Sequence, residues 1–386
     1  AEAGRKSRQL LKRAARRNPS ALIVAAGCQA ELTPDALPCD LAAGNELKHH
    51  LPGAIRAFVQ TKEQPEQRSI AKISRFAEVG PVTRQAETRA YIKVQDGCNN
   101  FCSYCTIPLA RGRIRSRDEA EILKEAELLV QEGYKEVVLT GIHVCSYGRE
   151  RGLDSSALAR LVKKLDGIEG LERIRLSSLE PRSVTADFVR ILASADAFCP
   201  HFHLSLQSGS DKILRAMRRR YDTADFRKAA DYIRKSFPHV GLTTDVIVGF
   251  PGETEEDFRE TMAFCEEMGF SRLHVFRYSS RPGTAAAAMK GQVDGKTAKA
   301  RSEALIALGD RLAEAAMEKA LGRETEILLE DKNEHGFRQG YTPDYLMCEL
   351  RYPEKEALQT AEGDIVKVRL RAVDGERILA ENKGLL

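Results

Sequence analysis

The run AYIKVQDGCNNFCSYC, residues 90–105, joins a short apolar strand pattern to a loop that carries three cysteines. Cys98, Cys102 and Cys105 have the spacing Cys-x3-Cys-x2-Cys. Three thiolates on one short loop can hold three irons of a [4Fe–4S] cluster and leave the fourth iron open to another ligand. The alternative is a structural zinc site, which needs four closed ligands and usually a second Cys or His pair. No such pair follows the loop, because the other cysteines are scattered singly.

From residue 90 onwards, apolar segments alternate regularly with helical segments. The expected strands are Ala90–Gln95, Glu136–Thr140, Arg173–Ser177, His201–Leu206, Gly241–Val248 and Arg272–Tyr278. The expected helices between them are Arg117–Glu132, Ser155–Leu165, Thr185–Ala195, Ser210–Lys235 (in two pieces) and Thr254–Met268. This alternation predicts βαβ units and a parallel sheet, whose right-handed crossovers close toward a barrel. We therefore predict an α/β fold with a partial (β/α)6 barrel and functional residues at the carboxyl ends of its strands.

Two smaller regions flank this barrel, and we expect three domains, over residues 1–75, 84–315 and 318–386. The first region has a basic helix and a short buried strand from Ala21, as in the second half of an α/β domain. After a long helix at Lys296–Leu321 the pattern changes to short strands with turn residues between them. This pattern predicts a small all-β barrel. Its expected strands are Glu324–Glu330, Tyr345–Arg351, Asp364–Ala372 and Arg377–Glu381.

The composition is that of an ordinary soluble protein, with 42% hydrophobic and 30% charged residues in 386. No apolar run approaches the roughly 20 residues of a membrane span, so we expect no membrane contact. Free thiols favour the cytoplasm. The net charge is only +4, but positive residues are concentrated in three runs. One run is typical of a solvated face, whereas three together favour a polyanionic partner. The runs lie within residues 1–20, at Arg111, Arg113, Arg115 and Arg117, and at Arg215, Arg218, Arg219 and Arg220.

The cysteine loop, followed by Ala110-Arg-Gly, resembles the S-adenosylmethionine (SAM) loop of the radical SAM methylthiotransferases. Further blocks resemble that family in the same order along nearly the whole chain. They are Leu139-Thr-Gly-Ile-His, Ser177-Ser-Leu-Glu-Pro, His203-Leu-Ser-Leu-Gln-Ser-Gly-Ser, Thr244-Asp-Val-Ile-Val-Gly-Phe-Pro-Gly-Glu-Thr and Tyr278-Ser-Ser-Arg-Pro-Gly-Thr. The resemblance implies a transferase that replaces a C–H bond by C–SCH3, with a [4Fe–4S] cluster and SAM as cofactors.

The resemblance also implies roles for single residues. Cys98, Cys102 and Cys105 are the expected iron ligands. The expected SAM-binding residues, for which a loop hydrogen bond is the alternative role, are Gly141, Glu180, Gln207 and Asp245. His143 and His203, also near strand ends, are expected to be structural.

Members of the family carry a second [4Fe–4S] cluster on an N-terminal flavodoxin-like domain. Only Cys28 matches one of its ligands here, so we expect an incomplete flavodoxin-like domain and an N-terminally truncated chain.

Three blocks indicate the substrate within this resemblance. They resemble the subgroup that modifies N6-threonylcarbamoyladenosine at position 37 of tRNA, and they are Asn99-Asn-Phe-Cys-Ser-Tyr, Ser178-Leu-Glu-Pro and Arg281-Pro-Gly-Thr. The alternatives are methylthiolation of N6-isopentenyladenosine in tRNA or of a ribosomal-protein aspartate. An alternative of another class is a non-catalytic RNA-binding protein with a degenerate barrel, against which the intact cysteine triplet argues. We expect a monomer that binds the tRNA anticodon loop and takes electrons from a flavodoxin- or ferredoxin-type donor.

The C-terminal barrel resembles a TRAM domain, an RNA-binding module with an OB-like barrel. Its charge is unfavourable for RNA, because residues 318–386 hold 11 Lys and Arg against 15 Asp and Glu, a balance of 11 − 15 = −4. Any contact with RNA therefore depends on local faces. Alternate residues of one strand share a side, which places Lys367, Arg369 and Arg371 together. We expect RNA to contact these three residues and Arg111, Arg113 and Arg115.

Overall fold

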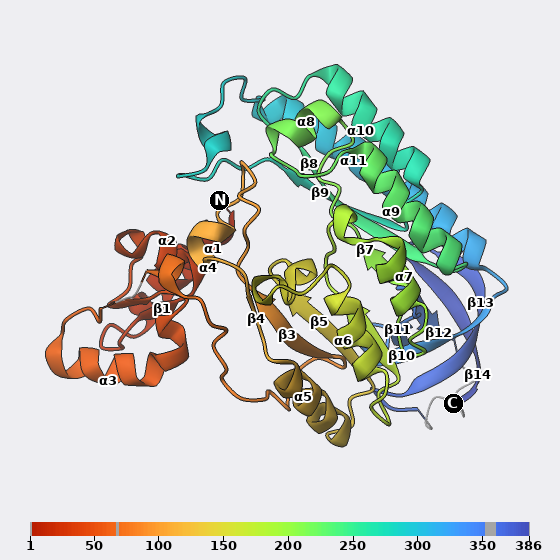
Figure 1. Ribbon diagram of the computed structural model, residues 1–386, viewed down its shortest axis with the longest axis horizontal. Helices are drawn as coiled ribbons and strands as arrows, with labels where there is room; N and C mark the ends of the chain where they lie inside the picture. Colours follow the sequence, from red (N-terminus) through yellow and green to blue (C-terminus); the bar gives the residue numbers. More distant parts are fainter. Residues whose placement is uncertain (1, 67–68, 352–359, 386) are drawn as a thin grey trace.

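The computed structural model describes residues 2–66, 69–351 and 360–385, and its centre is a curved parallel sheet (Figure 1). Strands β3, β5 and β6 pair in parallel, as do β7, β8 and β9. Parallel bridges at Ile174–Phe198 and Leu179–Leu204 link the two groups. The strands therefore follow one another in chain order, as the alternating pattern predicts. Their bounds are β3 Ala90–Asp96, β5 Glu136–Gly141, β6 Arg173–Leu176, β7 His201–His203, β8 Gly241–Val248 and β9 Arg272–Arg277.

Helices cover the outer face of this sheet, and α9, α10 and α11 lie along one side of it (Figure 1). Ile92 and Val94 of β3, together with Ile122 of α5, belong to one buried apolar cluster. Side chains alternate along a strand, so Lys93 and Gln95 face the interior of the barrel. The helices are α4 Ile107–Arg111, α5 Glu119–Gln131, α6 Ala157–Leu165, α7 Ala186–Leu192, α8 Asp211–Ala216, α9 Thr223–Ser236, α10 Glu255–Met268 and α11 Gly295–Ala320.

Two parts of the sheet differ from the sequence prediction. The two-residue strand β4, Arg115–Ser116, adds to the edge of β3 in antiparallel orientation and was not expected. Strand β7 ends at His203 rather than at residue 206, and beyond it single bridges replace continuous pairing. The chain then turns at Gln207, whose φ of 69° lies in the left-handed region. A turn of this kind cannot be recognised from the apolar pattern.

The C-terminal region forms a closed five-stranded barrel in the order β10-β11-β12-β14-β13, which confirms the expected small all-β barrel. Strands β13 and β14 are longer than the third and fourth expected strands to which they correspond, and β11 was not expected. The second expected strand starts later, because Tyr345 turns with a φ of 71°. The bounds are β10 Glu324–Lys332, β11 Arg338–Tyr341, β12 Met347–Leu350, β13 Ile365–Asp374 and β14 Arg377–Leu385.

The turn between β11 and β12 closes the amino-terminal end of the parallel barrel. Arg175 of β6 donates to the carbonyl oxygens of Thr342 (2.9 Å) and Pro343 (2.7 Å). The ring of Tyr345 stacks on His201 at 4.6 Å between centroids. The opposite, carboxyl-terminal end of the strands therefore remains as the rim for the cysteine loop.

The N-terminal region packs beside that rim (Figure 1). It contains a parallel pair of short strands, β1 and β2, with helices around them. The basic helix expected over residues 1–20 is present as α1. The bounds are α1 Glu2–Arg17, β1 Val24–Ala26, α2 Cys28–Leu32, β2 Leu41–Ala43 and α3 Leu51–Thr61. Among the described residues, none of the helices is both long and apolar enough to span a membrane.

Candidate functional site

The cysteine loop is held at both ends by backbone contacts. Gly97 has a φ of 74°, and a Cβ there would lie 1.9 Å from the carbonyl oxygen of Arg113, so only glycine fits. The amide of Cys98 donates to the carbonyl of Gly112 at 3.0 Å. Farther along the loop, the amide of Ser103 donates to the carbonyl of Met217 at 3.0 Å. These contacts fix the loop on the carboxyl-terminal rim, next to the segment that follows α8.

Each of the three cysteine sulfurs receives a hydrogen bond. The amides of Asn100 and Ile107 donate to Cys98 and Cys105, both at 3.4 Å. The guanidinium of Arg219 donates to the sulfur of Cys102 at 3.2 Å. Such donors stabilise thiolates, the form in which cysteine binds iron, and tune the potential of iron–sulfur clusters.

Burial opposes ionisation of two of these thiols in the metal-free protein. It raises the pKa of Cys98 and raises the pKa of Cys105 to about 11. Metal binding would favour deprotonation, since cysteine ligands bind as thiolates. Among the described residues, no three His, Cys, Asp or Glu side chains are arranged around one metal-ion position. Three cysteines on one loop, each with a hydrogen-bond donor to its sulfur, fit the three protein ligands of a [4Fe–4S] cluster.

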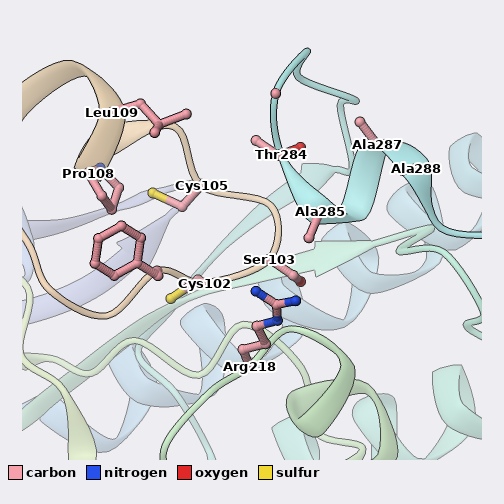
Figure 2. Close-up of a pocket in the computed structure, with 12 residues that line it drawn as sticks. Cys102, Ser103, Cys105, Pro108, Leu109, Arg218, Thr284, Ala285, Ala287 and Ala288 are labelled. Atoms are coloured by element: carbon pink, nitrogen blue, oxygen red, sulfur yellow. The ribbon is translucent and has the colours of Figure 1, made fainter.

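A cavity of about 650 Å³ adjoins the cysteine loop (Figure 2). Figure 2 shows the sulfurs of Cys102 and Cys105 at this cavity, with Arg218 below the loop and the segment containing Ala285 across from it. Most of its wall is apolar, including Pro108 and Leu109. An apolar wall of this kind protects reactive species from water once a bound substrate covers it.

Glu180 joins the cysteine loop to the loop after β6. Its Oε2 accepts hydrogen bonds from Asn100 (2.7 Å) and His143 (2.9 Å) and lies 3.8 Å from Arg219. Burial by itself would raise the pKa of Glu180, but the hydrogen bond from His143 and the charge of Arg219 lower it to about 2. His143 thus has a positioning contact, in line with the structural role expected for it.

The Glu180→Gln substitution is expected to destabilise the metal-free protein by about 3 kcal/mol at neutral pH, because it removes the partner of a buried guanidinium. The pKa of Glu180 is lower in the folded state, so its stabilising contribution is complete above about pH 4.5 and is lost as the pH falls toward about 2. Urea unfolding of both proteins at several pH values measures this. The difference in the free energy of unfolding between the wild-type protein and the variant should narrow below about pH 4. A difference that stays constant with pH would contradict the lowered pKa of Glu180.

Of the other expected SAM-binding residues, Gly141 and Gln207 lie on the same rim, whereas Asp245 lies within β8 and not at its end, where it had been expected. A Cβ at position 141 would lie 2.9 Å from Oε1 of Gln95, so Gly141 is needed for packing within the protein. Gln207 accepts a hydrogen bond from the hydroxyl of Tyr104, in the cysteine loop, at 3.1 Å. Asp245 lies 3.2 Å from Nε2 of His203, which faces it from β7. The structure thus links Glu180 and Gln207 directly to the cysteine loop, whereas Asp245 lies deeper on β8.

The basic run after the cysteine loop is mostly engaged within the protein. Arg115 is buried, 3.5 Å from Asp96. Arg111 lies 3.6 Å from the same carboxylate, and Arg117 is buried between Glu78 and Glu125. A buried guanidinium needs such partners, so these side chains do not form a solvated RNA-binding face. Only Arg113 is exposed, with its guanidinium 5.5 Å from the centre of the Phe101 ring.

Sequence reasoning missed the role of Arg219, which belongs to the third basic run. Its guanidinium contacts Cys102, Glu180 and Tyr221, the last through a hydrogen bond of 3.0 Å. Only the position of this run shortly after Gln207, which follows the fourth expected strand, could have indicated this role. The charge pattern alone does not separate Arg219 from its neighbours.

Cys28 lies beside the helix that follows the cysteine loop. The Nε of Arg111, at the end of α4, donates to the sulfur of Cys28 at 3.1 Å. Asn45 secures the same junction, because its side-chain amide donates to the carbonyl of Ala110 at 2.7 Å. The N-terminal region therefore contacts the segment that carries the cysteine triplet.

Lys367, Arg369 and Arg371 lie on the outer side of β13, as their alternation predicts. Two of them already have carboxylate partners. Arg369 pairs with Glu324 of β10, and Arg371 pairs with Glu381 of β14. RNA would have to displace these acids, so the local face is less basic than the sequence indicates.

Comparison with known proteins places this geometry in a family. Residues 92–265 match the Radical SAM superfamily. The chain is 39% identical to the threonylcarbamoyladenosine tRNA methylthiotransferase MtaB of Bacillus subtilis (strain 168), covering 95% of this chain and 82% of that protein. It is 35% identical to the protein of the same name from Thermotoga maritima, covering 98% and 85%.

A relative with a different name is also similar. The chain is 36% identical to the tRNA-2-methylthio-N(6)-dimethylallyladenosine synthase of Thermobifida fusca, covering 95% of this chain and 75% of that protein. The matches extend over most of both chains in each case and include the parallel barrel with its cysteine loop. The chain belongs to the radical SAM methylthiotransferase family.

Proposed function

We propose that this protein is an enzyme that adds a methylthio group to carbon 2 of N6-threonylcarbamoyladenosine at position 37 of tRNA. The observation that carries the proposal is the 39% identity to the Bacillus subtilis MtaB protein over 95% of this chain. The cysteine triplet on the barrel rim supports it, because the reaction must activate an inert C–H bond. A [4Fe–4S] cluster and SAM, when bound, supply the radical chemistry for that activation.

The residues of the rim have separate binding roles. Cys98, Cys102 and Cys105 hold three irons, and the amides and Arg219 that donate to their sulfurs stabilise the thiolate form. Glu180, Gln207, Asp245 and the backbone at Gly141 orient the polar groups of SAM. The apolar wall of the adjoining cavity excludes water from the reaction.

The two flanking regions have different roles: the N-terminal region supplies the sulfur, and the C-terminal barrel binds the RNA. Residues 1–75 are part of a flavodoxin-like methylthiotransferase domain, in which Cys28 is one ligand of a second [4Fe–4S] cluster. Residues 84–315 form the radical SAM core, and residues 318–386 form a TRAM-like domain that contacts RNA through Lys367 and its neighbours. The protein acts as a cytoplasmic monomer on the anticodon loop, with electrons from a flavodoxin- or ferredoxin-type donor.

Mass spectrometry of tRNA nucleosides tests this function. A strain that lacks the gene should accumulate N6-threonylcarbamoyladenosine without the methylthio group, and the full-length gene should restore the methylthio derivative. The gene with all three loop cysteines changed to alanine serves as the matched control and should not restore it. Loss of methylthiolated isopentenyladenosine instead would reassign the substrate, and an unchanged nucleoside profile would contradict the proposal.

A further inference from the structure

Three consecutive arginines, Arg218, Arg219 and Arg220, spread around the cysteine loop instead of forming one basic face. Arg218 has a φ of 58°, in the left-handed region that non-glycine residues seldom adopt. Arg218 lines the cavity shown in Figure 2, while Arg219 turns inward to Cys102. Arg220 points to a second cavity on the Asn99 side of the loop. Strain of this kind is typical of functional sites.

The second cavity has a volume of about 410 Å³ and three arginines in its wall. Arg149 comes from the loop after β5, Arg182 from the loop after β6, and Arg220 from the segment after α8. All three are exposed, and none forms an ion pair with a carboxylate among the residues that the structure describes. The Arg182 guanidinium donates to the carbonyl of Arg220 at 2.8 Å, and the Arg220 guanidinium donates to the carbonyl of Asn99 at 3.4 Å, which holds both groups in one wall.

The remaining wall leaves this positive charge largely uncompensated. Glu180 is its only acidic residue among those described, and its carboxylate already faces Asn100, His143 and Arg219. The hydroxyls of Ser146 and Ser183 also line the wall but already contact His143 and Cys145. The arginines therefore remain as the phosphate donors, and guanidinium groups bind phosphate oxygens in bidentate geometry.

We propose that this cavity binds a backbone phosphate of the RNA substrate, next to the nucleotide that reacts. This proposal rests on the proposed action on tRNA and adds a subsite to it. An enzyme that modifies a base must hold that base out of its stack, so the protein also needs contacts that fix the flanking RNA backbone. Asn99 and Asn100 belong both to this cavity wall and to the cysteine loop, so a phosphate bound here lies beside the reacting centre. Three exposed arginines from separate loops suit a polyanion.

Binding of an unmodified anticodon stem–loop RNA tests this subsite. The variant with Arg149→Gln, Arg182→Gln and Arg220→Gln should bind this RNA roughly tenfold or more weakly at moderate salt. The slope of log K against log salt, measured between ~50 and ~200 mM, should fall by about 0.7, which is the contribution of one phosphate contact to single-stranded RNA. Changing the same residues to lysine keeps the charges and should preserve most of the slope.

The control removes exposed positive charges elsewhere. Arg160 and Arg190 lie on outer helices and pair with Asp154 and Asp187, so Arg160→Gln with Arg190→Gln should leave both affinity and slope nearly unchanged. An equal loss of RNA affinity in this control variant would contradict the proposed phosphate subsite. Unchanged RNA affinity in the triple arginine variant would also contradict it. A loss of SAM binding with unchanged RNA binding would reassign the cavity to SAM. If the wild-type protein itself does not bind the RNA, the proposed function fails along with the subsite.

Discussion

Changing any one of Cys98, Cys102 or Cys105 to serine is expected to abolish assembly of the cluster and cleavage of SAM. Each thiolate on the loop would hold a different iron, so no neighbouring residue can replace it. Loss of one thiolate leaves one iron of the cluster without a protein ligand. Anaerobic reconstitution, followed by iron and sulfide analysis and by measurement of 5′-deoxyadenosine, gives the result.

A buried cysteine outside the loop provides the matched control. Cys265 lies in α10 within the main apolar core, and Cys265→Ala removes a thiol without touching the site. This variant should keep a full cluster and the cleavage of SAM. Iron content and cleavage that survive in the loop variants would contradict the ligand assignment. Zinc in place of iron in the wild-type protein would restore the zinc alternative.

The Glu136→Gln substitution is expected to have the largest effect on stability. Glu136 is 1% exposed and faces three guanidinium groups at the amino-terminal end of the parallel barrel. Its carboxylate lies 2.7 Å from Arg175 and 3.7 Å from both Arg89 and Arg173. Burial would raise its pKa, but the charges of these arginines lower it. Without the carboxylate, buried positive charges lose their common partner, which costs about 3–5 kcal/mol.

The same cluster joins the two barrels. Arg173 also pairs with Glu326 of β10 at 3.0 Å, and Arg89 pairs with Glu330. Thermal unfolding of the Glu136→Gln variant should therefore show a melting temperature lower by roughly 5 °C. Glu132→Gln is the matched control, because Glu132 pairs with Arg84 at the surface, and its effect should stay within about 0.5 kcal/mol. Equal melting temperatures for the two variants would contradict the role of the buried cluster.

Much of the parallel barrel could be predicted from the sequence. The bounds of β8 agree with the apolar run Gly241–Val248, and α10 begins within one residue of its expected start. The start of α10 is set by a capping box between Thr254 and Asp257, a local signal that the sequence carries. By contrast, the late start of β12 follows Tyr345, whose positive φ carries no apolar signature. The early end of β7 reflects pairing that continues beyond His203 only as single bridges.

The candidate site was predictable only where its chemistry is local. The three cysteines lie within eight residues, so their spacing alone indicates a cluster. Glu180 and Gln207 were placed on the rim by the barrel rule and by family resemblance. Arg219 could not be selected, because its contacts with Cys102 and Glu180 span 117 and 39 positions along the chain.

The alternating strands and helices and the cysteine spacing thus suffice to predict the parallel barrel, the small β-barrel and the thiol loop, because these patterns are set by neighbours in the chain. The role of each arginine depends instead on contacts between distant segments. Arg115 is buried against Asp96 and Arg219 against Cys102, while Arg220 donates to the carbonyl of Asn99 at the wall of a cavity. The physical reason is that a guanidinium is stable in the interior only beside a suitable acceptor, and the fold brings these acceptors from distant segments.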